Sequence, residues 1–370
     1  MPEYLTPGVF VEETSARSRA IVGVATATTA FIGAAGSGGV ETPVELGSTA
    51  DFIAQFGSSP TPLQEAVQGF FDAGGRRAVG LRVRPSRASL KRALAALAAT
   101  DAALVVLSPP APGADVPAWA WAAAARFARL HRRFLLVDAP AGWAAGGARE
   151  PSSLGIVEAD AGHCALYFPQ VRRAAEHLEP PSGVVAGLIA RSDAARGVWA
   201  APAGAEATLP VAGLAVDVTD AEQTALNAVG VNCLRSFAAT GPVVWGARTL
   251  AAAAPELASL AAQRTLQYVI RSLDRGTLWA VFEPNDPLLW AQIRSAVSTF
   301  LYELWRLGGL LGSAPEDAFF VRCDRSTMSQ SDLDNGRLVF QIGLALVRPA
   351  EFVLARLCQS TADAGSTADA

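Results

Sequence analysis

Short apolar segments alternate with helical segments between residues 78 and 138, and this alternation is the strongest constraint on the fold. The apolar segments are Ala78–Val83, Ala103–Leu107 and Phe134–Asp138. Between them, Ser86–Ala99 and Pro117–His131 have helical patterns. Parallel strands joined through helices are covered on both faces and therefore read as continuous apolar runs. The sequence predicts an α/β domain with a largely parallel sheet.

The segments before this region carry signals for short strands and capped helices. Residues 20–33 are rich in β-branched residues and predict one or two strands, followed by a glycine-rich loop. Pro43–Leu46 predicts a short strand. We expect Ser48 or Thr49 to cap a brief helix and Thr61 to cap the next one, because hydroxyl side chains satisfy free N–H groups at helix starts.

A change in composition marks a candidate domain boundary near residue 210. Gly, Pro and Ala dominate Pro180–Gly204, where they bracket a short helix expected over Val184–Ala195. Such a composition is typical of an irregular connector that lies over a surface. We therefore place the main boundary after this connector.

The remainder of the chain predicts a mixed α/β unit that ends in a long apolar ribbon. Amphipathic helices are expected over Pro255–Leu273 and Pro287–Leu307, with Asn285 or Asp286 capping the second. The final ribbon has few breakers and needs a sheet to join. The expected strands are Ala212–Val218, Val231–Phe237, Pro242–Arg248, Leu278–Phe282, Phe319–Arg322, Leu338–Val347 and Glu351–Leu357.

The composition argues against nucleic acid as a partner, against secretion or a membrane span, and against a cysteine-based framework. The 34 acidic residues outnumber the 30 basic ones, so no basic field favours nucleic acid. The N-terminus lacks the pattern of a secretory signal, and no apolar run is long enough to cross a membrane, so we expect synthesis in the cytosol. The cysteines are isolated in apolar segments and resemble buried hydrophobic residues, not a disulfide or metal framework: Cys164, Cys233, Cys323 and Cys358.

No recognised catalytic motif occurs in the chain. It has no zinc-protease, nucleophile-elbow, Cys-x-x-Cys or Walker A pattern. Asp138 stands at the carboxyl end of an expected strand, but with no partner nearby a loop or cap role is favoured. His163 and Cys164 are adjacent on an expected strand, so their side chains point to opposite faces and cannot form a dyad. We expect no catalytic, cofactor or metal site.

Six sequence blocks stand out in order along nearly the whole chain. They are YLTPGVFVEE, FFDAGGRRAVGLRV, PPSGVVAGLIARSDAARGVWAAPAG, NAVGVNCLRSFAATGPVVWGARTL, RGTLWAVFEPND and AFFVRCDRSTMSQSDLDNGRL. Together these blocks resemble the tail sheath proteins of contractile phage tails, and they are most similar to the sheath subunits of phage-tail-like contractile injection particles. The chain departs from the family pattern at Val79-Gly80 and in a shorter, alanine-rich stretch around residues 100–170.

The resemblance implies a domain plan. It implies a linking arm over residues 1–19, an α/β outer domain over 20–210 with a reduced insertion around 100–170, and a core domain over 211–358. Residues 359–370 lack apolar anchors and are expected to be a disordered tail.

The resemblance also implies that subunits are linked by exchanged strands. An N-terminal and a C-terminal strand would each join the sheet of a neighbouring subunit. Alternatively, both are ordinary strands of their own subunit. The candidate exchange residues are Val9, Phe10, Val11, Glu12, Glu13, Glu351, Phe352, Val353, Leu354, Ala355, Arg356 and Leu357.

The implied function is mechanical. Such sheaths surround an inner tube, store energy in a metastable extended lattice and contract to drive the tube through a target envelope. The implied partners are other sheath subunits, identical or paralogous, the tube protein, and baseplate and terminal cap proteins, with assembly in a phage tail or tail-like particle after synthesis in the bacterial cytoplasm. Neither nucleic-acid binding nor membrane insertion is expected. Arg294 and Arg306 are candidates for touching the tube, or simply solvated charges.

A second hypothesis comes from the fold class alone. The strand and helix alternation and the position of Asp138 are also compatible with a cytosolic α/β enzyme or nucleotide-binding domain. Fold class does not determine function, so this alternative rests on analogy.

Overall fold

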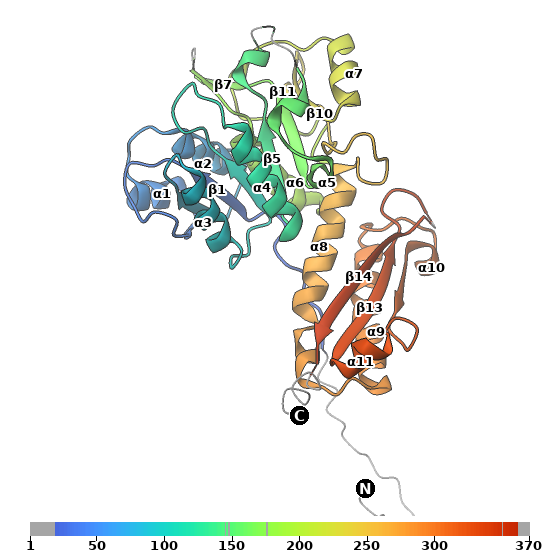
Figure 1. Ribbon diagram of the computed structural model, residues 1–370. Helices are drawn as coiled ribbons and strands as arrows, with labels where there is room; N and C mark the ends of the chain where they lie inside the picture. Colours follow the sequence, from blue (N-terminus) through green and yellow to red (C-terminus); the bar gives the residue numbers. More distant parts are fainter. Residues whose placement is uncertain (1–18, 145, 147–148, 175–176, 350, 362–370) are drawn as a thin grey trace, which may run out of the picture.

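The computed structural model describes residues 19–361, except 145, 147–148, 175–176 and 350. The predicted N-terminal arm, including Val9–Glu13, and residues 362–370 of the predicted tail lie outside the described residues. The expected start of that tail at residue 359 is wrong, because the last strand runs to Ser360 and the side chains of Gln359 and Thr361 are buried. Figure 1 shows a larger α/β body and a smaller body, with the long helix α8 (Leu260–Gly276) running between them. No helix in the described ranges combines the length and the apolar character that a membrane span requires.

A mostly parallel sheet of eight strands forms the larger body, which confirms the expected α/β class. Its strand order is β11-β10-β6-β5-β4-β1-β3-β2, and only the edge strands β2 and β11 run antiparallel to their neighbours. Each apolar run predicted between residues 78 and 138 is one of its strands. The strands are β1 (Thr29–Gly33), β2 (Val44–Leu46), β3 (Ala78–Arg82), β4 (Leu104–Leu107), β5 (Phe134–Asp138), β6 (Cys164–Phe168), β10 (Val231–Phe237) and β11 (Gly241–Val244).

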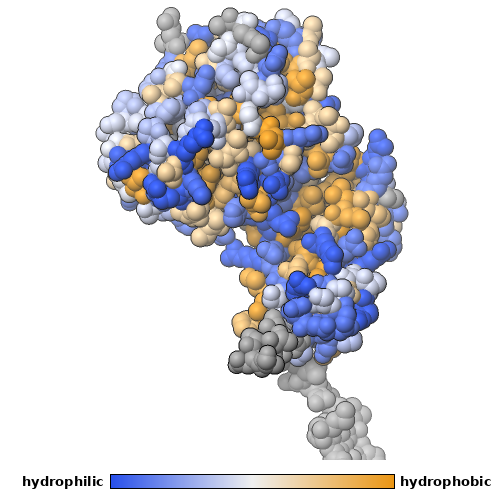
Figure 2. Space-filling view, viewed as in Figure 1, coloured by the Kyte–Doolittle hydropathy of each residue, from blue (hydrophilic) through white to orange (hydrophobic). Residues whose placement is uncertain are grey.

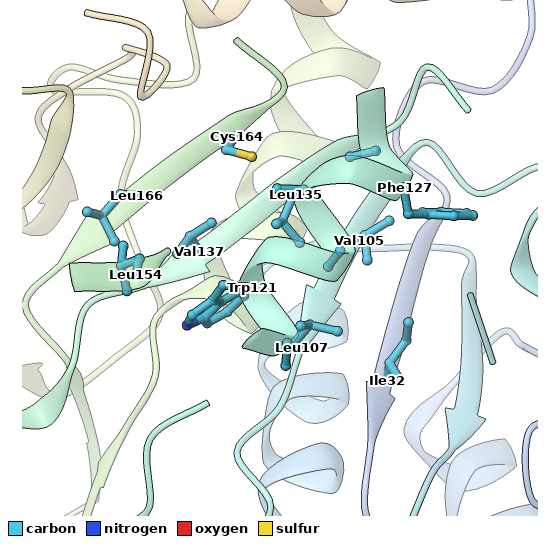
Figure 3. Close-up of a cluster of buried hydrophobic side chains, with 14 of the residues drawn as sticks. Ile32, Val105, Leu107, Trp121, Phe127, Leu135, Val137, Leu154, Cys164 and Leu166 are labelled. Atoms are coloured by element: carbon cyan, nitrogen blue, oxygen red, sulfur yellow. The ribbon is translucent and has the colours of Figure 1, made fainter. Parts of the chain in front are cut away.

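Helices cover both faces of this sheet because its strands are apolar on both sides. In β4, Val105 and Leu107 face the helices α3 (Arg87–Leu97) and α4 (Ala118–Leu130), whereas Leu104 and Val106 face the opposite layer. Figure 3 shows Trp121 of α4 beside Val105 and Leu107. The opposite layer contains α1 (Thr49–Phe56), α2 (Pro62–Asp72) and α6 (Ser182–Arg196).

The helix caps predicted at Ser48 and Thr61 are present, together with others of the same kind. The hydroxyls of Ser48, Thr61 and Ser86 each accept a hydrogen bond from a backbone N–H in the first turn of α1, α2 and α3. Thr219 and Glu222 form a reciprocal capping box on α7 (Asp220–Ala228). Local side-chain chemistry therefore fixes where these helices begin.

The helix expected over Val184–Ala195 is present, but the interpretation of Pro180–Gly204 as a connector lying over a surface is wrong. Helix α6 is longer than expected, and most of its residues are buried against α2 and the sheet. An added Cβ on Gly183 or Gly187 would lie 2.5 Å or 2.2 Å from backbone oxygens of α2. The glycines are therefore close-packing positions between two helices.

The boundary expected near residue 210 also needs correction. Strands β10 and β11 follow that position and still belong to the eight-stranded sheet, because β10 pairs with β6. The strand expected over Ala212–Val218 is reduced to β9 (Gly213–Leu214). It joins β7 (Val171–Ala174) and β8 (His177–Glu179) in a small separate sheet.

The smaller body has its own core and an antiparallel sheet. The sheet order is β12-β13-β14, with β12 (Phe319–Arg322), β13 (Arg337–Leu344) and β14 (Val353–Ser360). Helix α9 (Pro287–Arg306), capped by Asp286 as expected, contributes a buried stripe to this core. Shorter helices are η1 (Ala141–Trp143), η2 (Pro151–Leu154), α5 (Glu158–Ala161), α10 (Pro315–Ala318) and α11 (Gln330–Asp334).

The strand expected over Leu278–Phe282 is instead a 3-10 helix, η3. Its backbone hydrogen bonds stay local, since Thr277 N–H donates to Leu273 and Ala280 N–H donates to Thr277. The side chains of Leu278 and Phe282 are 54% and 84% exposed. An apolar run directly after a helix was therefore mistaken for a buried strand.

Candidate assembly surfaces

The C-terminal ribbon pairs with β13 of its own chain. The antiparallel register runs from Arg337 opposite Ser360 to Leu344 opposite Val353. Of the candidate exchange residues, Val353–Leu357 lie in β14, whereas Glu351 and Phe352 precede it. The Phe352 ring contacts Phe320 of β12 at 5.2 Å between centroids. A single chain thus adopts the alternative in which the ribbon is a strand of its own subunit.

The outer edge of β14 is an edge of the sheet, because β13 is its only strand neighbour within the described residues. Leu357 points into the core and Leu354 is 58% exposed. Gln359 is buried, and its Nε2 donates to the carbonyl of Asp274 at 3.0 Å and to Thr277 Oγ1 at 3.1 Å. Strand β14 is therefore held by its backbone pairing with β13 and by the hydrogen bonds of Gln359 to the C-terminal end of α8.

The first described residues pack near the same end of α8. The Arg19 guanidinium stacks over the ring of Trp279 at 4.0 Å and donates to Glu283 Oε1 at 2.7 Å. Val24 N–H donates to Ser272 Oγ at 3.1 Å. Since Gln359 contacts Thr277, both ends of the described chain are anchored around α8 and η3. Sequence reasoning missed this shared anchor because its contacts join residues far apart in the chain.

Apolar side chains are exposed beside this anchor. Leu278 and Phe282 of η3 and Leu288 at the start of α9 are 54%, 84% and 67% exposed. Figure 2 shows hydrophobic surface on the smaller body as well as on the larger one. Exposed apolar groups that gather on one region are typical of a contact surface.

The two arginines proposed for tube contact differ. Arg294 is partly buried, and its guanidinium donates to the carbonyl oxygen of Cys323, so it is engaged within its own chain. Arg306 is exposed at the end of α9. Of the pair, Arg306 is the accessible charge.

The residues that suggested enzyme chemistry have structural partners. Asp138 accepts hydrogen bonds from the backbone N–H and the hydroxyl of Ser182 at 2.8 and 2.7 Å, so it caps α6 as expected. Burial raises the pKa of Asp138 to about 7. His163 Nδ1 lies 2.7 Å from Gln267 Nε2, and the Cys164 thiol donates to the Asp160 carbonyl at 3.5 Å. Burial lowers the pKa of His163 and raises that of Cys164, so neither is activated as a dyad.

Comparison with known proteins identifies the family. Residues 120–250 match the phage tail sheath protein central domain, and residues 253–359 match the phage tail sheath C-terminal domain. The chain belongs to the phage tail sheath family. The junction between the two matched regions lies just before α8, where the eight-stranded sheet has ended. This sheath protein therefore changes domain about forty residues later than its composition suggests.

Solved structures of contractile particles resemble the sheath protein over nearly its whole length. The anti-feeding prophage helical sheath in its contracted state is 28% identical, with a TM-score of 0.78 and coverage of 97% of this chain and 100% of that one. The sheath complex of the PVC extracellular contractile injection system, also contracted, is 28% identical, with a TM-score of 0.74 and coverage of 97% and 99%.

A curated relative extends the comparison to phages. The tail sheath protein of Vibrio phage KVP40 is 26% identical over 187 residues, which are 50% of this chain. The match spans only 27% of that longer protein. The shared part is thus a common sheath segment to which the phage protein adds much further sequence.

Proposed function

We propose that this chain is the repeating subunit of a helical contractile sheath that surrounds an inner tube. The observation that carries the proposal is the match, over 97% of the chain, to the contracted anti-feeding prophage sheath. The role is structural and mechanical, without catalysis. Its partners would be further sheath subunits, the tube, a baseplate and a terminal cap, in a phage tail or tail-like particle made from subunits synthesised in the bacterial cytoplasm.

In the sheath, neighbouring subunits would be linked by strands that cross between them. The edges of the β12-β13-β14 sheet offer unpaired backbone groups for strand addition. The loop before β14 contains the exposed residues Val347, Arg348 and Pro349, and it would act as the hinge that releases β14. In the sheath, β14 would then pair with β13 of a neighbouring subunit in the same register that it has with β13 of its own chain.

Contraction would be driven by energy stored during assembly. A metastable extended lattice releases free energy when its subunit contacts improve on contraction, and no nucleotide is needed. The linked strands would keep the lattice connected during this change, and the tube would be driven through a target envelope. Of the two candidate arginines, Arg306 is the exposed one and would be the one to face the tube.

Electron microscopy of the purified full-length chain, alone and with its tube protein, tests this function. The expected result is striated cylinders of uniform width, formed most readily around the tube. Deletion of residues 1–19 should leave a folded chain that forms no cylinders. If the full-length chain stays dispersed at high concentration and with tube protein present, the proposal fails.

The deletion itself needs a control for folding. Arg19 contacts Trp279 and Glu283, so a deletion of residues 1–17 keeps this anchor and removes only the arm. Circular dichroism melting of both truncated chains would show whether each is folded. Regular cylinders from the chain lacking residues 1–17 would contradict N-terminal linkage while leaving the sheath function intact.

A further inference from the structure

Three side chains that suit a metal ion converge where α2 meets β8. Glu65 lies on α2, and His177 and Glu179 are alternate residues of β8, so they share one face of the strand. One ligand atom from each of the three lies within 4.8 Å of the others. Glu65 Oε1 and His177 Nε2 are already 3.0 Å apart.

Glu179 is the most unusual member of this cluster. Its side chain is only 5% exposed, and its Oε1 accepts a hydrogen bond from Arg173 Nε at 2.8 Å. Its Oε2 is buried and has no hydrogen-bond partner in the described part of the chain. A buried carboxylate oxygen without a partner is costly, so it is a position where a bound cation would be stabilising.

The charges around the cluster are unbalanced. Arg173 also donates to Asp72 Oδ2 at 2.6 Å. Arg173 therefore pairs with two carboxylates, those of Asp72 and Glu179. The third carboxylate, that of Glu65, pairs with His177, which adds a positive charge only when protonated. With a neutral imidazole, the cluster carries two excess negative charges, which one divalent cation would neutralise.

We propose that Glu65, His177 and Glu179 bind a divalent transition-metal ion of the zinc class, with water completing the coordination. Zinc accepts imidazole nitrogen and carboxylate oxygen at about 2.0–2.2 Å, which places neighbouring ligand atoms about 3.3 Å apart. The Glu65–His177 distance fits this spacing. The other ligand distances, which are within 4.8 Å, would shorten when the ion binds, and the half-exposed imidazole has room to move. Calcium and magnesium prefer sites made entirely of oxygen ligands.

The ion would join α2 to the β7–β8 hairpin. Arg173 would act as a positioning residue, because it holds one oxygen of Glu179 and leaves the other for the metal. The site goes beyond the proposed sheath function and does not depend on it. It also departs from the expectation of no metal site, because its ligands come from segments far apart in the sequence with no recognisable spacing.

Equilibrium dialysis of the untagged full-length protein against Zn²⁺ tests the site, with metal counted by mass spectrometry. We expect one zinc per chain, with saturation at micromolar or lower concentration and no displacement by millimolar Mg²⁺. Glu179→Gln keeps the acceptor for Arg173 and should weaken binding at least tenfold, as should His177→Ala. His131→Ala, at another exposed histidine, should bind as the wild type does.

Thermal melting and X-ray absorption test the same metal site independently of dialysis. Thermal melting with and without Zn²⁺ should show a zinc-dependent rise for the wild type and His131→Ala only. His177 is half exposed, so its replacement leaves a folded chain even if Glu179→Gln does not fold. X-ray absorption should show nitrogen and oxygen ligands. No saturable binding, unchanged affinity in His177→Ala, or sulfur ligands from the cysteines would overturn the proposal.

Discussion

Arg264 and Asp193 form a bidentate ion pair that is almost fully buried between α8 and α6. Arg264 Nη1 lies 2.9 Å from Asp193 Oδ1, and Nη2 lies 2.6 Å from Oδ2. The two side chains are 2% and 4% exposed. Arg264 Nη2 also donates to the carbonyl of Thr26 at 3.1 Å. The pair thus ties the helix that leads to the smaller body to the core of the larger one.

Asp193→Asn should destabilise the chain by about 3–5 kcal/mol, because it leaves the Arg264 charge buried without a counter-charge. Chemical denaturation of the unassembled chain, followed by circular dichroism, measures the loss. Arg196 and Glu206 provide a matched control, because Arg196 lies on the same helix as Asp193 and its partner Glu206 is 80% exposed. Glu206→Gln should cost less than about 1 kcal/mol. Equal effects of the two substitutions would contradict the role assigned to burial.

Gly187→Ala should destabilise the chain even though alanine is the better helix former. The added Cβ would lie 2.2 Å from the carbonyl oxygen of Phe70, so α2 and α6 must separate. Overpacking of this kind costs about 1–3 kcal/mol, more than the gain of about 1 kcal/mol in helix propensity. Denaturation midpoints measure the difference. Gly142→Ala, where an added Cβ meets nothing within 4 Å, should be close to neutral.

Sequence patterns predicted the elements whose formation is determined by residues close together in the chain. The buried runs of β3, β4 and β5 and the caps of α1 and α2 follow from residues close in sequence. The burial of helix α6 could not be recognised, because its glycines reflect a close approach to α2, which lies far away in the chain. For the same reason, the boundary near residue 210 was wrong. Strands β10 and β11 complete a sheet whose first strand, β1, lies about two hundred residues earlier.

The candidate surfaces were predicted less completely. The family resemblance predicted exchange strands at both ends of the chain. The structure places β14 at a sheet edge, whereas Val9–Glu13 lie outside the described residues. The engagement of Arg294 with the Cys323 carbonyl was not visible, because a helical pattern shows which face is polar but not which polar groups find partners. The Glu65, His177 and Glu179 cluster likewise depends on a tertiary contact between α2 and β8.

Asp138→Asn should change how stability depends on pH. The pKa of Asp138 is raised from 3.8 to about 7 by burial, so between these values the folded chain holds a proton that the unfolded chain has lost. This residue therefore lowers stability as pH rises from about 4 to 7, by a total on the order of 4 kcal/mol, and the penalty is constant above pH 7. Asparagine does not titrate and still accepts from the Ser182 N–H.

The measurement is the difference in unfolding free energy between Asp138→Asn and the wild type at several pH values. That difference should shift in favour of the variant from pH 4 to 7 and then level off. Ser182→Ala removes a hydrogen bond that lowers this pKa, so it should extend the pH-dependent window upward in the otherwise wild-type chain. A difference that stays constant across the range would show that Asp138 is already ionised at pH 4.

Val339→Cys should reveal whether β14 is exchanged between subunits. Val339 lies directly opposite Cys358 in the β13–β14 register, and such residues are about 4.5–5.5 Å apart between Cα atoms, close enough for a disulfide. In assembled cylinders, an exchanged β14 would join the cysteines of different subunits. Mild oxidation should then give a ladder of covalent oligomers on non-reducing gels, which collapses to monomer on reduction. Val339→Cys with Cys358→Ser should give no ladder. Oxidised cylinders that run only as monomers carrying an internal disulfide would show that β14 stays in its own subunit.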